Sequence, residues 1–193
     1  MPEIGQVESS RRASIVIMDE AAMDRALIRM AHEIVEETGG GDELAIVGIQ
    51  RRGVQLAERI AREIERQTGK APEQGAMDIT LYRDDLQQIG DQAIVQKTEM
   101  PFAVQARTIV LVDDVLYTGR TIRAALNEIM DFGRPQRVLL AVLVDRGHRE
   151  IPIRADFVGK NIPTSRSQQI KVKVGDLDGV WEVELIDRGT EAI

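Results

Sequence analysis

Three continuous apolar runs constrain the fold of this chain more than any other feature of its sequence. They are LAIVGIQ at 44–50, TIVLVDD at 108–114 and RVLLAVLVD at 137–145. Apolar runs without polar alternation are typical of strands that are covered on both faces. The first two runs each precede a segment with apolar residues at helical spacing. Strands that alternate with helices predict an α/β fold with a central, mostly parallel sheet flanked by helices, where ligands bind at the carboxyl ends of the strands.

Weaker patterns predict the elements around this sheet. Residues 19–37 carry apolar side chains at three- and four-residue spacing, which predicts an amphipathic helix with Asp19 as its N-cap. Residues 77–83 are rich in β-forming side chains, and the polar stretch at 84–106 predicts a long flexible loop or hairpin. Three short patterns resemble additional strands, near 155–159, 169–174 and 180–186.

Length and composition exclude several classes of protein. The 193 residues favour one domain over 1–193, with a flexible N-terminus at 1–14. The absence of cysteine excludes disulfides, thiolate metal sites and a cysteine nucleophile. No apolar run approaches the roughly 20 residues of a membrane span, and the N-terminal residues do not resemble a secretory signal, so we expect a cytoplasmic location and no membrane partner. The net charge of −7 argues against extensive wrapping of nucleic acid, but it allows a local basic patch.

The string VLVDDVLYTGRT places two adjacent carboxylates at the end of the second apolar run. Behind Asp113 and Asp114, backbone N–H groups and the hydroxyls of Thr118 and Thr121 are expected to converge at a helix N-terminus, which is a favourable place for a phosphate. The carboxylates suit a neighbouring group rich in hydroxyls, such as a ribose, or a bridging Mg²⁺ ion. A sugar phosphate satisfies both halves of the motif.

Other interpretations of this string fit less well. A Walker A loop needs GxxxxGK[ST], whereas here a single glycine is followed by Arg120. The dinucleotide fingerprint GxGxxG does not occur in the chain. Phosphatases of the haloacid-dehalogenase type place their second Asp two positions after the first, where this chain has Val115. An acidic pair that merely caps a strand is the alternative without chemistry.

The whole string resembles the phosphoribosyl-pyrophosphate (PRPP) signature of the type I phosphoribosyltransferases. Three more segments narrow the resemblance: DRALIRMAHEIVE at 24–36, DITLYRDDL at 78–86 and GRPQRVLLAVLVDRGHREIPIRADFVGKNIPTSRS at 133–167. They are similar to segments of the bacterial pyrimidine-operon attenuation regulators, whose members also act as uracil phosphoribosyltransferases. The resemblance implies the type I phosphoribosyltransferase fold, with a small hood at 145–167 over the base and a flexible loop over the site.

The resemblance implies a role for each part of the site. Asp113 and Asp114 are expected to act as catalytic residues that hold the ribose hydroxyls of PRPP, with Mg²⁺ bound through PRPP and these carboxylates. The loop behind them is expected to bind the 5′-phosphate of PRPP or UMP, through Val115, Leu116, Tyr117, Thr118, Gly119, Arg120 and Thr121. GIQRRG at 48–53 matches the family's pyrophosphate loop, which assigns Arg51 and Arg52 to the leaving group. The alternative for Arg52 is a solvated surface arginine.

Two further groups complete the expected site. Tyr82 and Arg83 lie in the segment that resembles the start of the flexible loop, and are expected to approach the pyrophosphate as catalytic residues. The alternative there is an edge strand and a loose loop. The hood residues expected near uracil are Val144, Asp145, Arg146 and Ile162. Purine-specific relatives have an Asp where this chain has Tyr117, which disfavours a purine substrate. No base for the uracil N1 proton is evident from the sequence.

A second function is implied by a basic region. In residues 145–173, Lys and Arg outnumber Asp and Glu by seven to three, in contrast to the acidic chain as a whole. The resemblance implies binding of leader-RNA hairpins, and the matching positions are Arg29, His32, Arg149, Arg154 and Lys160. The alternatives are that Arg149 serves the hood and that His32 is an ordinary surface residue, and Ile28 stands where relatives often have a hydroxyl.

These observations leave three functional readings open. The main one is a uracil phosphoribosyltransferase that also binds pyrimidine-operon leader mRNA in response to UMP or UTP. The others are a regulator that keeps the PRPP and UMP pocket only as a sensor, and a transferase without RNA function. The resemblance also implies a homodimer or a larger homo-oligomer.

Overall fold

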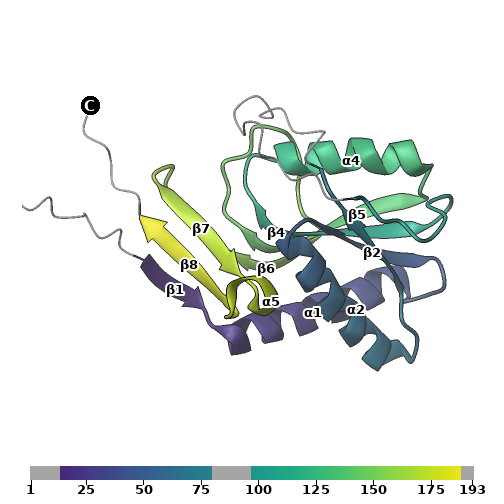
Figure 1. The fold of residues 1–193 in the computed structure, drawn as a ribbon, viewed down its shortest axis with the longest axis horizontal. Coiled ribbons are helices and arrows are strands. Elements are labelled where there is room, and N and C mark those ends of the chain that lie inside the picture. Colours follow the sequence, from purple (N-terminus) through teal and green to yellow (C-terminus); the bar gives the residue numbers. More distant parts are fainter. Residues whose placement is uncertain (1–13, 80–96, 188–193) are drawn as a thin grey trace, which may run out of the picture.

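Two β-sheets share one apolar core in this protein (Figure 1). The computed structural model describes residues 14–79 and 97–187. A five-stranded parallel sheet has the strand order β3-β2-β4-β5-β6, and a three-stranded antiparallel sheet has the order β1-β8-β7. The main sheet consists of β2 (Leu44–Ile49), β3 (Glu73–Met77), β4 (Thr108–Leu116), β5 (Arg137–Asp145) and β6 (Phe157–Asn161). The small sheet consists of β1 (Ser14–Met18), β7 (Gln168–Lys173) and β8 (Glu182–Asp187).

Helices cover both faces of the main sheet, as the apolar runs predicted. Helices α1 (Glu20–Thr38) and α2 (Arg52–Thr68) pack on one face, and α4 (Arg120–Phe132) packs on the other (Figure 1). Alternate residues of β4 point to the two faces: Val110 lies in the cluster that contains the α1 and α2 side chains, and Leu111 lies in the α4 cluster. The predicted parallel α/β fold is therefore confirmed.

The two ends of α1 agree with the helix predicted at 19–37 with Asp19 as its N-cap. The Asp19 carboxylate accepts a hydrogen bond of 2.8 Å from the Ala22 N–H and caps α1. Gly39 ends this helix in the left-handed conformation, with φ of 75°, and donates its N–H to the Val35 carbonyl. A short helix, α5 (Gly175–Asp178), connects β7 to β8 in the small sheet.

Three expectations about the strands need correction. The third strand is β3, which shares only Met77 with the predicted 77–83 segment, because its parallel register with β2 pairs Met77 with Ile49 at the strand end. Strand β4 continues beyond 114 to Leu116, so the acidic pair lies within the strand and not at its end. Strand β1 was not predicted, because its SIVIM segment has only five residues; it pairs with β8, and its Met18 is buried in the core.

The hood boundaries also differ from the arrangement of the strands. Part of the expected hood, β6, pairs with β5 in the main sheet. The separate small sheet is instead built from both ends of the described chain, by β1 and by the β7–α5–β8 segment (Figure 1). The hood at 145–167 was implied by the resemblance, whereas pairing between strands distant in the sequence decides which residues form the small sheet.

Within the expected flexible segment at 84–106, the structure describes residues 97–106, where Glu99 forms an isolated antiparallel bridge with Ala76. The remainder of that segment lies outside the described residues. No helix in the described ranges is long and apolar enough to cross a membrane.

The packing of α2 on β4 predicts the effect of one substitution. A Cβ atom at Gly53 would lie 2.5 Å from the Val112 carbonyl oxygen. Alanine favours a helix over glycine by about 1 kcal/mol, but this contact would force the helix away from the strand. We expect Gly53→Ala to lower the free energy of unfolding by about 1–3 kcal/mol, as overpacking does, in urea denaturation. Gly41→Ala is the control, because a Cβ there meets nothing within 4 Å; equal stability of the two variants would contradict this packing.

Candidate functional site

The acidic pair lies in the central strand of the main sheet, close to its carboxyl end. Asp113 is buried, with 7% of its surface exposed, and Asp114 is half-buried. The Asp114 N–H donates to Asp113 Oδ1 over 2.9 Å, and the Val115 N–H donates to Asp114 Oδ1 over 2.8 Å. The two side chains also interact with each other directly, so the carboxylates lie close together.

Burial raises the pKa of Asp114 above its ordinary value. The positive charge of Arg52 and the hydrogen bond from the Val115 N–H act in the opposite direction. The same attraction contributes to raising the pKa of Arg52. The structure therefore places the Asp114 carboxylate, in β4, where it attracts the Arg52 cation at the start of α2.

The loop behind the pair leads directly into α4. Gly119 adopts a left-handed conformation, with φ of 93°, and α4 begins at Arg120. The Arg120 N–H approaches the Thr118 hydroxyl oxygen at 3.4 Å, and the Arg120 side chain forms an exposed ion pair with Glu150. Helices leave the N–H groups of their first turn without intrahelical partners, and these groups bind anions well. The acidic pair and the loop at 115–121 that is predicted to bind a phosphate therefore lie on one strand-to-helix connection. This loop is called the anion loop below.

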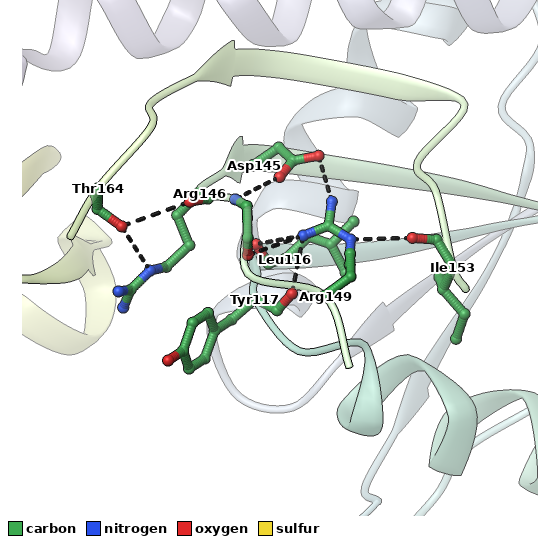
Figure 2. A network of polar contacts seen from close by, with 8 residues as sticks. Leu116, Tyr117, Asp145, Arg146, Arg149, Ile153 and Thr164 are labelled. Carbon is green, nitrogen blue, oxygen red and sulfur yellow. Dashed lines mark hydrogen bonds and ion pairs between the residues drawn. The ribbon is translucent and has the colours of Figure 1, made fainter. Parts of the chain in front are cut away.

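The carbonyl groups of this loop are held by the segment that follows β5 (Figure 2). The Leu116 carbonyl accepts from the Arg146 N–H at 3.1 Å, and the Thr118 carbonyl accepts from the N–H groups of Glu150 and Ile151 at 3.0 and 3.1 Å. The Tyr117 carbonyl accepts from Arg149 Nη1 at 2.8 Å. With its carbonyls bound on this side, the loop is fixed in shape without a ligand.

Arg149 is the centre of that network (Figure 2). Its guanidinium also donates to the carbonyls of Ile153 and Gly147, and it forms an ion pair with the Asp145 carboxylate. Arg149 was expected on an RNA surface, but its side chain is only 23% exposed and its donors are directed at internal acceptors. The alternative, that Arg149 supports the structure around the site, agrees with these contacts.

The expected hood residues have different environments. Val144 is completely buried in the core and Ile162 is half-buried against it, while Asp145 is paired with Arg149. Arg146 is buried, its guanidinium carbon lies 4.1 Å from the centre of the Tyr117 ring, and burial lowers its pKa. It donates to the Thr164 hydroxyl (Figure 2) and to the carbonyls of Ser165 and Gln168. Arg146 thus joins Tyr117 of the anion loop to the connection before β7.

The GIQRRG segment forms the turn from β2 into α2, next to the acidic pair. The Gln50–Arg51 peptide bond is cis, and Arg51 is exposed. Arg52 donates from Nε and Nη2 to the two carboxylate oxygens of Asp178 in α5, over 3.1 and 3.0 Å. These hydrogen bonds raise the pKa of Arg52 and lower the pKa of Asp178. The sequence contained no signal for Asp178, because 126 positions separate it from Arg52.

The residues expected to bind RNA fall into separate places. Arg29 donates to the carbonyls of Val158 and Gly159 in β6, and Lys160 donates to the Ile17 carbonyl, so both line one hollow between α1 and β6. His32 and Arg154 are exposed. Tyr82 and Arg83, expected at the pyrophosphate, lie outside the described residues.

The donor set fits a magnesium ion that is bound mainly by a substrate. Among the described residues, no group of three or more His, Asp or Glu side chains is placed to hold a metal. Mg²⁺ commonly uses one or two carboxylates together with substrate phosphates and water. Asp113 and Asp114 are two carboxylates close together at this site, so they would be compatible with an ion bound in this way.

Comparison with known proteins identifies a family for this arrangement. Residues 17–177 match the model of the phosphoribosyl transferase domain. The chain is 60% identical over 172 residues to the bifunctional protein PyrR of Thermus thermophilus, an alignment that covers 89% of this chain and 95% of the relative. It is 52% identical over 179 residues to the bifunctional protein PyrR of Deinococcus deserti, with 93% and 97% covered.

Solved structures show the same fold at low sequence identity. A hypoxanthine phosphoribosyltransferase of Trypanosoma cruzi has a TM-score of 0.68 at 14% identity, and the match covers 89% of this chain and 95% of that one. A hypoxanthine phosphoribosyltransferase of Staphylococcus aureus has a TM-score of 0.65 at 17% identity, with 88% and 90% covered. The expected type I phosphoribosyltransferase fold is thereby confirmed.

The raised pKa of Asp114 predicts that this residue destabilises the folded protein. Ionisation of a carboxyl with a raised folded-state pKa costs folding free energy. That cost is absent below the ordinary pKa of 3.8, grows as pH rises toward the folded-state pKa, and is complete above it. Asp114→Asn should therefore unfold at a higher temperature than the wild type at neutral pH, and the difference should disappear in acid. Thermal unfolding followed by circular dichroism measures this, and a lower Tm at neutral pH would contradict it.

Proposed function

This chain belongs to the phosphoribosyl transferase domain family, as a relative of the bifunctional PyrR proteins, and we propose that it is a uracil phosphoribosyltransferase that also binds leader RNA. The observation that carries the transferase role is the connection from β4 to α4. It presents an acidic pair beside Arg52 and, a few residues later, a helix N-terminus behind a preformed loop. PRPP consists of a ribose with free hydroxyls between a 5′-phosphate and a pyrophosphate. The acidic pair suits the hydroxyls, the helix N-terminus suits the 5′-phosphate, and Arg52 suits the pyrophosphate.

The acidic pair and the anion loop position the sugar. Asp113 and Asp114 accept hydrogen bonds from the ribose hydroxyls, and the 5′-phosphate lies against the first turn of α4. The threonine hydroxyls and backbone N–H groups of residues 118–121 are its donors. Because the loop carbonyls are already bound by residues 146–151, the loop does not have to reorganise when it binds the phosphate, and positioning of this kind lowers the barrier to reaction.

Arg51 and Arg52 serve the leaving group. The bond between the ribose C1 and the pyrophosphate oxygen breaks, and its electron pair leaves with the pyrophosphate. A bond forms between C1 and the uracil N1, whose proton is lost to solvent. Cationic side chains stabilise the charge that grows on the departing oxygen. Magnesium bound with PRPP would add electrostatic stabilisation of that charge, next to Asp113 and Asp114.

The uracil is assigned to the segment that starts at Asp145 and includes Arg146. Tyr117 supports a pyrimidine over a purine, because its ring, packed under Arg146, occupies the position of the aspartate in purine-specific relatives. Tyr82 and Arg83 are proposed to approach the pyrophosphate. The oligomeric state and a cytoplasmic location remain predictions.

The ribose assignment predicts a loss of turnover without a loss of folding. Asp113→Asn and Asp114→Asn should each reduce kcat/KM by about 100-fold or more, the scale found for removing one preorganised charged or polar contact to a transition state. The assay combines uracil, PRPP and Mg²⁺ and measures UMP. Asp42→Asn is the control, because Asp42 lies in an exposed ion pair with Lys70 before β2. No UMP from the wild type would refute the transferase role.

RNA binding rests on a different surface. The hollow between α1 and β6 is lined by three basic residues, Arg25, Arg29 and Lys160. Two of them, Arg29 and Lys160, are among the residues expected to bind RNA. Exposed His32 lies on the same helix. A cationic surface attracts the phosphate backbone of RNA by releasing counterions. We assign the leader hairpin to this surface, with Arg154 as a further contact and UMP or UTP as the signal that strengthens binding.

This assignment predicts how RNA affinity depends on salt. Lys160→Gln and Arg154→Ala should each weaken binding of a leader hairpin and reduce the slope of log affinity against log salt by about 1, as expected for one lost phosphate contact. Filter binding at several salt concentrations, with and without UMP, measures both effects. Arg62→Ala on α2 is the control, since this exposed arginine lies outside the hollow. If the hairpin binds no better than scrambled RNA, the protein is a transferase without RNA function. If RNA binding depends on UMP but no turnover is measured, the protein is a regulator that uses its nucleotide pocket only as a sensor.

A further inference from the structure

Asp178 is the one residue of the small sheet's β7–β8 connection that forms an ion pair with the GIQRRG turn, within the described residues. We propose that Asp178 is a positioning residue for the transferase, which aims the Arg52 guanidinium at the leaving pyrophosphate of PRPP. This inference rests on the proposed transferase function. It assigns a catalytic contribution to an aspartate that does not itself touch the substrate.

The geometry of the pair is that of a side-on fork. Asp178 Oδ2 accepts from Arg52 Nε at 3.1 Å, and Asp178 Oδ1 accepts from Nη2 at 3.0 Å. Two parallel hydrogen bonds fix the plane of a guanidinium as well as its position. The fork leaves Nη1 outside the pair, and the Arg52 side chain is 33% exposed. One end of a fixed, charged group therefore remains accessible to an anion.

Asp178 is itself held firmly. Its Oδ2 also accepts the Val174 N–H at 3.0 Å, which ties the carboxylate to the start of its own short helix. The hydrogen bonds from Arg52 are the largest cause that lowers the pKa of Asp178, so the carboxylate stays ionised at neutral pH. Only 18% of its side chain is exposed. A carboxylate bound to both its own backbone and Arg52 is a rigid support.

The position of Arg52 explains why it needs such a support. Asp114 attracts the same guanidinium, and burial makes the charge of Asp114 costly. Asp178 and Asp114 are the two carboxylates whose charges act on Arg52. Without Asp178, a direct pair between Arg52 and Asp114 would remove both from the substrate. Asp178 thus keeps the cation close to Asp114 but oriented by a different carboxylate. Arg52 then remains available for the pyrophosphate, and Asp114 remains available for the sugar.

The decisive variant is Asp178→Asn, which keeps the shape of the side chain and an acceptor for Val174. We expect the KM for PRPP to rise about tenfold, the scale of one lost hydrogen bond to a charged group, and the KM for uracil to stay unchanged. Calorimetric titration with magnesium pyrophosphate should show the same tenfold loss without any turnover. Asp176→Asn is the matched control, because Asp176 is an exposed residue of the same short helix.

A double-mutant cycle separates positioning from a general structural role. In an Arg52→Gln background, Asp178→Asn should cause no further rise in the KM for PRPP, because its effect passes through Arg52. An additional loss there, or a parallel rise in the KM for uracil, would overturn the proposal. Asp178→Glu, which keeps the charge, should recover most of the pyrophosphate affinity; it also serves as the test if Asp178→Asn does not fold.

Two other outcomes are equally informative. Tighter binding of pyrophosphate by Asp178→Asn would show that Asp178 competes with the substrate for Arg52, and would refute positioning. Unchanged kinetics of Asp178→Asn in an active wild-type background would also refute it. If the wild type binds neither PRPP nor pyrophosphate, the proposed transferase function fails first, and this result is distinct from the other two.

Discussion

The close contact between the first turn of α2 and strand β4 is the constraint on which the candidate site depends. Gly53 lies against the Val112 carbonyl, so closely that no side chain fits between them, and Gly48 in β2 lies against the backbone of Val54 in the same way. These two contacts bring the turn after β2 down to the level of the acidic pair in β4. Arg52, at the start of that turn's helix, is thereby placed where its charge acts on Asp114. Strand β4 and the start of the helix after β2 thus place opposite charges at the same end of the sheet, which is the end where ligands bind in such folds.

The main sheet could be predicted from the sequence because the physical signal is local. Continuous apolar runs identified β2, β4 and β5, since each of these strands buries both faces, and the helices between them carry buried apolar residues at helical spacing. The acidic pair and the anion loop were recognisable for a related reason, because all their residues lie in one short string. Strand β3 was misplaced for the opposite reason: it is an edge strand of the main sheet, the β-forming side chains after Met77 gave the stronger signal, and register with β2 decided its true position.

What the sequence did not predict depends on contacts between distant residues. The patterns near 169–174 and 180–186 indicated β7 and β8 as strands, but they did not indicate that these strands join β1 in a separate sheet. Asp178 could not be linked to Arg52, because nothing in the local GDLD segment indicates a partner 126 positions away. Arg149 was assigned to RNA by resemblance, while the structure directs its donors to the carbonyls of Tyr117, Gly147 and Ile153. Charge alone cannot tell whether an arginine faces solvent or the backbone.

The position of Arg149 gives the two proposed functions a physical connection. The carbonyls of Leu116, Tyr117 and Thr118 are bound by residues 146–151, and the exposed Arg154 lies three positions further along the chain. An anion bound by the amides of Thr118 and Gly119 would polarise the same peptide chain whose carbonyls Arg149 and the N–H groups of Glu150 and Ile151 hold. A ligand can shift a surface only by interacting differently with its alternative states. A loop that is hydrogen-bonded on one side to a nucleotide phosphate and on the other to a basic segment has the contacts needed for that difference, so regulation by a nucleotide does not require a second binding site.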